Sequence, residues 1–389
     1  MPTDVSSTVM YNQSKVWLAL WLFPLVSAYA MIIMPLTLYS LYQTQGLPGL
    51  SQPEGHAHEM LFGLVTGLIA GYLSGRPERK VALLILLAWF AARVASLNWP
   101  DSLWSTVLQA LLVALLLWQI LPRLNAAKRW RNRILLPLIF ALLGLGVLSA
   151  LSRGLTLPMW FWPTAQVTGI LLALLLSYMG GRLLAPAIAN AIDRTGGTIL
   201  KARVQPRIEG GLILTLATAA LLSLSSTQIP GWFSALPLWL AALLICIRIV
   251  RWQPWRLGGR LDLLCLLAGY GWLAPGLIVM ALQQTRGLST GPGLHLVTIG
   301  TLGILATGVI MRLTAQRRKR DLPTGSWWAL IALLFSLAAV SRALPDLFLL
   351  LPWSARTILY FFAAGGWSLA WGLTLIYQLR TLQRPVVST

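Results

Sequence analysis

Residue types that bind metals gather in one short stretch of the chain, which reads His56-Ala57-His58-Glu59-Met60. Imidazole nitrogen and thioether sulfur are metal ligands, and an ionisable group inside a membrane segment is costly enough to suggest a function. The chain has only 3 histidines, and the third, His295, lies far along the sequence. These residues predict a metal site that draws on two separate segments.

The spacing of the histidines indicates which residues can share a metal. At about 100° per residue, His56 and Met60 lie on one face of a helix, whereas His58 points the other way with Phe62. His58 facing His295 across two helices would hold a haem iron from both sides, and His56 with Met60 would suit Cu(I). The residues do not decide whether such an iron has two axial histidines or one histidine and another axial ligand. A helix that begins only at Glu59 would instead let His56 and His58 bind one metal.

The composition is that of a membrane protein, because 57% of the residues are hydrophobic, 10% are charged and the mean hydropathy is +0.73. A soluble domain carries about 25% charged residues. Apolar runs of about 20 residues, the length that spans a bilayer, predict an all-α polytopic protein with about twelve transmembrane helices. Their predicted ranges are 17–41, 56–74, 81–97, 103–121, 134–151, 165–184, 211–228, 232–250, 261–281, 291–312, 326–344 and 355–378.

The net charge of +20 is explained by membrane topology. Clusters such as 317–320 (Arg-Arg-Lys-Arg) fall in alternate connections between the predicted spans, whereas the opposite connections hold only Arg153, Arg286 and Arg356. The positive-inside rule therefore places both termini in the cytoplasm. The charge indicates a basic face for anionic lipid, and no nucleic-acid partner is expected.

With this topology, all three histidines lie at one depth near the external surface. Arg93 and Arg342 fall at the same depth, where they would pair with the propionates of a haem or extend to the interface. Glu59 is a candidate proton carrier, a hydrogen-bond partner that fixes a histidine tautomer, or an ion-pair partner of one of these arginines. A histidine also suits a membrane interface without any metal.

The chain is predicted to form one integral membrane domain, 1–389, with a break near 185–210 that suggests halves 1–200 and 201–389. A weaker similarity links two spans. His58 is followed by glycines at offsets of 5 and 13 residues, and so is His295. Such glycines let neighbouring helices approach closely. Cys246 and Cys265 lie near cytoplasmic span ends, so no disulfide is expected.

The chain resembles the NnrS family of bacterial membrane proteins in three stretches. They are 56–63 (His-Ala-His-Glu-Met-Leu-Phe-Gly), 179–182 (Met-Gly-Gly-Arg) and 295–300 (His-Leu-Val-Thr-Ile-Gly), which continues to Met311-Arg312. The resemblance implies an inner-membrane protein with haem b and copper that is linked to denitrification and nitric oxide stress. It also implies that His56, His58 and His295 are metal ligands. One departure is that 313–320 holds no histidine where the family pattern leads us to expect one.

We therefore expect a haem-binding and copper-binding protein that handles nitric oxide or iron-nitrosyl species. The residues do not decide whether the protein is an enzyme or a sink that only binds nitric oxide. A permease for copper or haem is one alternative. An accessory subunit of a respiratory complex, with degenerate metal sites, is the other. An electron donor would be needed only if the protein turns over.

Overall fold

The computed structural model describes residues 15–43, 46–126, 133–194, 205–224, 229–348 and 351–384. Its longer α-helices are α2 (Leu18–Tyr42), α5 (Arg79–Asn98), α6 (Leu103–Asn125), α8 (Leu135–Gly154), α9 (Pro158–Arg194), α10 (Pro206–Leu224), α11 (Gly231–Arg251), α12 (Leu261–Gly271), α13 (Leu273–Thr285), α15 (Gly303–Arg318), α16 (Gly325–Leu347) and α17 (Trp353–Gln383). The shorter ones are α3 (Pro53–His58), α4 (Val65–Leu73) and α14 (Gly291–His295).

The predicted all-α membrane fold is confirmed. In the described ranges, 11 helices are long and apolar enough to cross a membrane, and α12 with α13 count as one of them. The remaining predicted span, 56–74, is built from α3, the π-helical segment η2 (Glu59–Leu64) and α4. Each predicted span therefore corresponds to helical structure, although α9 extends well beyond the predicted 165–184.

The chain divides into two compact units, which are described separately. Unit 1 covers Met1–Ala165 and Leu382–Pro385, and unit 2 covers Gln166–Thr381 and Val386–Thr389. The prediction of one domain with halves that meet near residue 200 stays a prediction.

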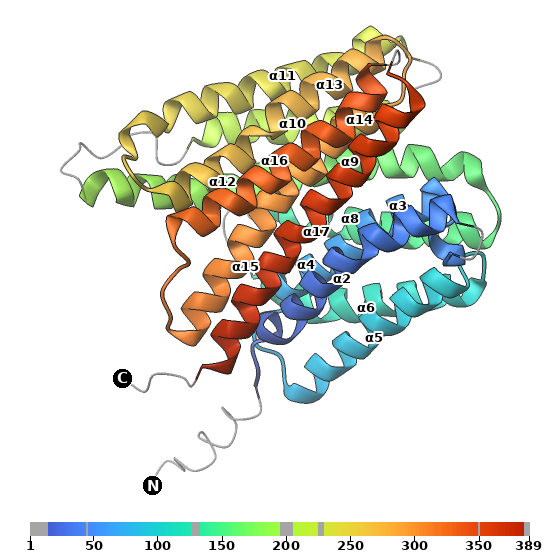
Figure 1. Ribbon diagram of the computed structural model, residues 1–389, viewed down its shortest axis with the longest axis horizontal. Coiled ribbons are helices and arrows are strands. Elements are labelled where there is room, and N and C mark those ends of the chain that lie inside the picture. Colours follow the sequence, from blue (N-terminus) through green and yellow to red (C-terminus); the bar gives the residue numbers. More distant parts are fainter. Residues whose placement is uncertain are drawn as a thin grey trace, which may run out of the picture. The chain divides into compact units, whose positions relative to one another are not determined.

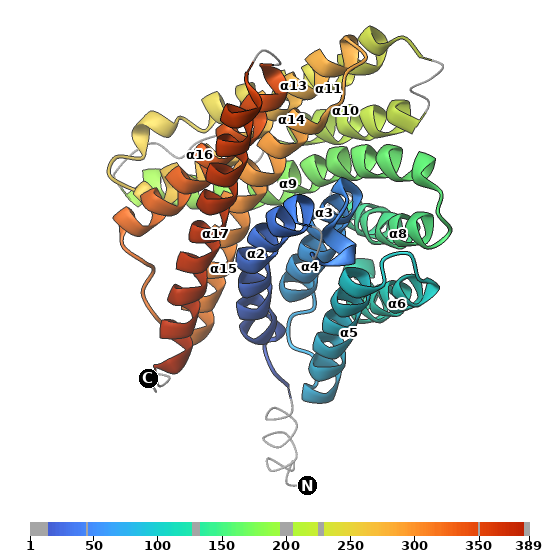
Figure 2. The same cartoon turned by 45° about the vertical axis from the view of Figure 1, so that its right-hand side comes forward.

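Unit 1 is a bundle in which α2 packs against α4, α5 packs against α6, and α6 packs against α8. Figures 1 and 2 both show these helices, blue to cyan-green, side by side. Short connections fix the order of neighbours. Pro53 begins α3, where its missing N–H costs nothing. Ser102 caps α6 by accepting a hydrogen bond from the Trp104 backbone N–H at 3.1 Å.

The two ends of unit 1 differ in charge. One end holds the α4–α5 connection with Arg76 and Arg79, together with the end of α6, where Arg123 donates to the Leu73 carbonyl at 3.2 Å. The opposite end, here called the outer end, holds the start of α3, the α5–α6 connection and the end of α8. By the positive-inside rule, the outer end is the one predicted to face away from the cytoplasm.

Unit 2 contains the later helices. In it, α11 packs against α10 and α13, and α16 packs against α12, α14 and the π-helical segment η4 (Leu296–Leu302). Pro292 lies in the first turn of α14. The helix α15 ends at Arg318, and the next residue, Lys319, has a left-handed backbone conformation with φ of 51°.

Candidate functional site

The two histidines that are followed by glycines at matching offsets, His58 and His295, each end a short α-helix that runs directly into a π-helix. His58 closes α3 and is followed by η2, while His295 closes α14 and is followed by η4. π-Helical turns are rare, and they occur often at functional sites. The similarity of the two stretches in sequence is therefore matched by a shared local backbone that sequence inspection did not predict.

The glycines of the two stretches let neighbouring helices approach, as expected. A Cβ added at Gly71 would lie 2.3 Å from the Phe23 ring, and one added at Gly308 would lie 2.3 Å from a Leu266 methyl. Both distances are shorter than real contacts of a Cβ atom. Each glycine thus lets a helix of the same unit pack closely behind a histidine segment.

His58 is buried inside unit 1, with 1% of its surface exposed. Its Nδ1 lies 3.0 Å from Ser149 Oγ on α8, and its ring centroid lies 5.5 Å from that of Phe62. The contact with Phe62 agrees with the predicted side of the helix. Since Nδ1 has a partner within the unit, Nε2 is the nitrogen that remains for a metal.

Glu59 is fully buried and lies at the centre of a polar network. Arg93 Nη1 donates to Glu59 Oε2 at 2.7 Å, and Tyr29 Oη donates to the same oxygen. Arg93 Nη2 donates to Gln109 Oε1 at 2.5 Å. Of the three roles considered for Glu59, the ion pair with Arg93 is therefore the one for which the structure supplies the contacts.

The π-helical turn contributes to this network through its backbone. Trp89 of α5 donates an indole N–H to the Gly63 carbonyl at 3.1 Å, and its ring packs edge-on against Tyr29 at 5.3 Å. Carbonyl groups inside a membrane segment need partners, because lipid offers none. Trp89 thus stabilises the irregular turn and fixes α5 beside it.

His56 and Met60 lie on the other side of the same segment, and both are half-buried. Their prediction as copper ligands stays a prediction. Within the described residues, no group of three or more histidine, cysteine, aspartate or glutamate side chains could hold a metal ion.

In unit 2, His295 is half-buried, and its Nδ1 lies 2.8 Å from the Gly291 carbonyl oxygen, four residues earlier. A carbonyl only accepts, so Nδ1 carries the hydrogen, and in the neutral ring Nε2 then carries the lone pair. This is the tautomer that a metal-binding histidine adopts when a backbone carbonyl orients its ring.

Arg342 also lies in unit 2, where it forms an ion pair with Asp346 at 2.6 Å. The Tyr360 hydroxyl donates to the other Asp346 oxygen at 2.9 Å, and the guanidinium lies 4.8 Å above the Tyr360 ring. Both predicted propionate-binding arginines thus have acceptors on the chain itself, and a haem propionate would compete with these acceptors.

One family model matches residues 21–385, and its description is NnrS protein. The chain belongs to the NnrS family. A comparison with curated proteins found no match.

Within this NnrS chain, a haem site would need fewer side-chain ligands than a copper site made of side chains alone. A haem iron already has four porphyrin nitrogens and takes one or two axial ligands, which His58 and His295 could supply through Nε2. The two histidines lie in different units, so their pairing around one haem stays a prediction.

The second family stretch, 179–182, has a packing role in the structure. A Cβ at Gly181 would lie 2.3 Å from the Arg248 guanidinium, and one at Gly180 would lie 2.7 Å from the Tyr270 ring. Arg248 is 3% exposed and donates to the Ser177 carbonyl and the Tyr270 hydroxyl, both at 3.2 Å. The glycine pair thus makes room for a buried arginine.

Arg182 and Arg312, the arginines of the second and third family stretches, have separate partners. Arg182 donates to Tyr178 Oη at 2.5 Å, one helical turn away. Arg312 forms an ion pair with Asp262 at 2.7 Å, and Asp262 also pairs with Arg260 at 3.0 Å.

The residues of these networks that sequence inspection missed include Tyr29, Trp89, Gln109, Ser149 and Arg248. Gln109 gave the clearest signal, because an amide inside an apolar span needs a hydrogen-bond partner.

Proposed function

We propose that this NnrS-family membrane protein binds haem b through His58 and His295 and takes part in the handling of nitric oxide or iron-nitrosyl stress. We further propose that it resides in the inner membrane of a bacterium, with the histidine segments near the external face. When bound, haem supplies an iron that coordinates diatomic ligands such as nitric oxide.

The observation that carries the proposal is the contact that each histidine ring makes through Nδ1. His295 donates from Nδ1 to the Gly291 carbonyl, and Ser149 Oγ lies where it can accept from Nδ1 of His58. A metal-binding histidine almost always donates a hydrogen bond from the ring nitrogen that does not bind the metal. Both rings are thus oriented through Nδ1, and in the neutral ring this places the lone pair on Nε2, the nitrogen that would bind a metal.

The two histidines differ in how firmly they are held. His58 is buried beside Phe62 and Ser149, whereas His295 is half-buried. We infer that His58 is the better fixed ligand. Glu59, the next residue in the sequence, pairs with Arg93 of α5, and this contact holds the π-helical turn in place.

Copper is a second element of the proposal. His56 and Met60 are both half-buried, on the side of the segment away from His58. A histidine and a thioether suit Cu(I), because soft sulfur ligands select it.

The test is a reduced-minus-oxidised optical spectrum of the purified full-length protein, with metal analysis of the same sample. Haem b bands that shift when nitric oxide is added would support the proposal. Copper without haem would favour a permease that handles copper. Folded protein without either metal would overturn the proposal and favour an accessory subunit of a respiratory complex.

A further inference from the structure

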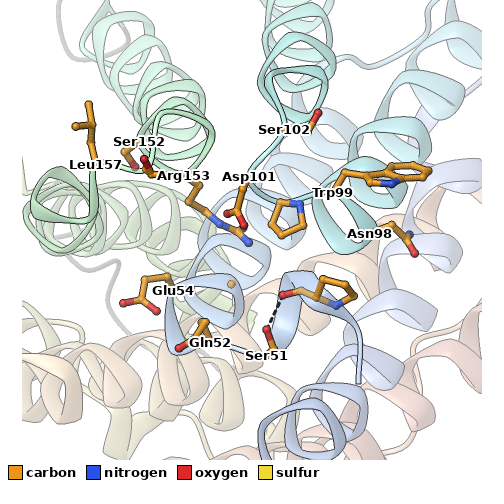
Figure 3. A pocket seen from close by; sticks show the side chains of 14 residues that line it. Ser51, Gln52, Glu54, Asn98, Trp99, Asp101, Ser102, Ser152, Arg153 and Leu157 are labelled. Carbon is orange, nitrogen blue, oxygen red and sulfur yellow. Dashed lines mark hydrogen bonds between the residues drawn. The ribbon is translucent and has the colours of Figure 1, made fainter. Parts of the chain in front are cut away.

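A cavity of 690 Å³ opens at the outer end of unit 1. It is bounded by the start of α3, the α5–α6 connection and the end of α8. Three charged side chains line it, namely Glu54, Asp101 and Arg153. Figure 3 shows Arg153 extending into the cavity, with Asp101 and Glu54 on opposite sides of its guanidinium in this view.

Among the described residues, none of these three side chains forms a close ion pair or a hydrogen bond. Charged groups that do not pair need solvent, since a bare charge in an apolar environment is very costly. The charges therefore indicate that the cavity is filled with water.

A stripe of polar residues leads from the cavity into the bundle along α6. Ser102 lines the cavity, and Ser105, Thr106 and Gln109 follow on the same face at spacings of three or four residues. The last three are at least nine-tenths buried. With a rise of about 1.5 Å per residue, the stripe is about 10 Å long. Gln109 then bonds to Arg93, and Arg93 bonds to Glu59.

The stripe contains polar atoms that lack partners within the chain. Among the described residues, the buried atoms of the stripe without a hydrogen bond include Thr106 Oγ1 and Gln109 Nε2. Buried polar groups are nearly always hydrogen-bonded, and ordered water is the usual partner when the protein offers none. These atoms therefore indicate sites for water at successive depths.

The helix that faces the stripe lies close to it, and two of its glycines stand where a side chain would press on the polar atoms. A Cβ added at Gly154 of α8 would lie 3.2 Å from Thr106 Oγ1, and one added at Gly146 would lie 3.3 Å from Gln109 Nε2. On the same helix, Ser152 lines the cavity and Ser149 contacts His58. Ser152 and Ser149 thus form a second row of polar side chains, which leads from the cavity to His58.

We propose that the cavity is the outer mouth of a water-filled path between α6 and α8 that reaches the Glu59–Arg93–Gln109 network. The path gives water, and the protons that water carries, access to the surroundings of His58 from the outer end of unit 1. It involves unit 1 alone and does not depend on bound haem.

The test is the reaction of single cysteines in the full chain with a charged, membrane-impermeant methanethiosulfonate reagent. The background carries Cys246→Ser and Cys265→Ala. Thr106→Cys places a thiol in the path, and Val107→Cys is the matched control, since it has the same depth but a 43% exposed position on the lipid side. Thiolates react only where water reaches them.

Thr106→Cys is expected to react at least tenfold faster than Val107→Cys, and adding Gly154→Leu should slow it at least tenfold. Size-exclusion elution confirms that each variant is folded. Equal, slow rates for both cysteines would overturn the proposal, and fast labelling that Gly154→Leu does not slow would overturn the route between α6 and α8. Should Thr106→Cys not fold, Ser105→Cys on the same stripe replaces it. The experiment measures only labelling rates and not haem content, so its result does not depend on the proposed function.

Discussion

The buried ion pair between Arg93 and Glu59 offers a quantitative test of the network beside His58. The two side chains are 3% and 0% exposed, and their closest atoms lie 2.7 Å apart. Charge centres about 4 Å apart in a medium of effective dielectric about 20 attract by about 4 kcal/mol. Removing one partner of a buried pair costs about 3–5 kcal/mol, because the other charge stays buried alone.

We therefore expect Arg93→Met and Glu59→Gln each to lower the free energy of unfolding by about 3–5 kcal/mol. The double variant should lose at least about 2 kcal/mol less than the sum of the two, since the partners are coupled. Lys80→Met, at an exposed position of the same helix, should change it by under about 0.5 kcal/mol.

The assay is equilibrium unfolding in mixed detergent and dodecyl sulfate micelles, followed by circular dichroism. Single variants that are as stable as the parent would refute the account of the pair as a buried structural contact. So would losses that simply add in the double variant.

Three further predictions concern close contacts and ligand orientation. Gly63→Ala should lower stability by about 1–3 kcal/mol, because its Cβ would lie 2.6 Å from a guanidinium nitrogen of the pair. Gly181→Ala should cost about the same in thermal unfolding, because its Cβ would lie 2.3 Å from another buried guanidinium. Gly144→Ala, which meets nothing within 4 Å, is the control for both and should be neutral or slightly stabilising. Ser149→Ala should weaken haem affinity about 10–100-fold in a titration, whereas Ser152→Ala should not; equal affinities would argue against orientation of the ring by Ser149.

The membrane fold was predictable because hydropathy over about 20 residues is a local property of the sequence. The span at 56–74 illustrates the limit of this signal. Its apolar length predicted a helix, but not the π-helical turn at Glu59–Leu64, which depends on tertiary contacts such as the Trp89 indole on the Gly63 carbonyl. The matching glycine offsets after His58 and His295 were the only sequence trace of the shared backbone.

The partners of the predicted site residues were harder to predict. Glu59 and Arg93 are 34 positions apart, so their contact depends on how α5 packs against the π-helical turn. Ser149 is one of several serines in apolar spans, and nothing local distinguishes it. Arg248 lies in the last turn of α11, where a basic residue also fits the positive-inside pattern, and this concealed its burial.

The central claim, that His58 and His295 hold haem, is tested most directly by the haem content of three purified variants. His58→Ala and His295→Ala should each lose at least nine-tenths of the haem per chain, measured as the pyridine haemochrome. His56→Ala, two residues from His58, should keep its haem and serves as the matched control. Full haem content in folded His58→Ala and His295→Ala would contradict the account.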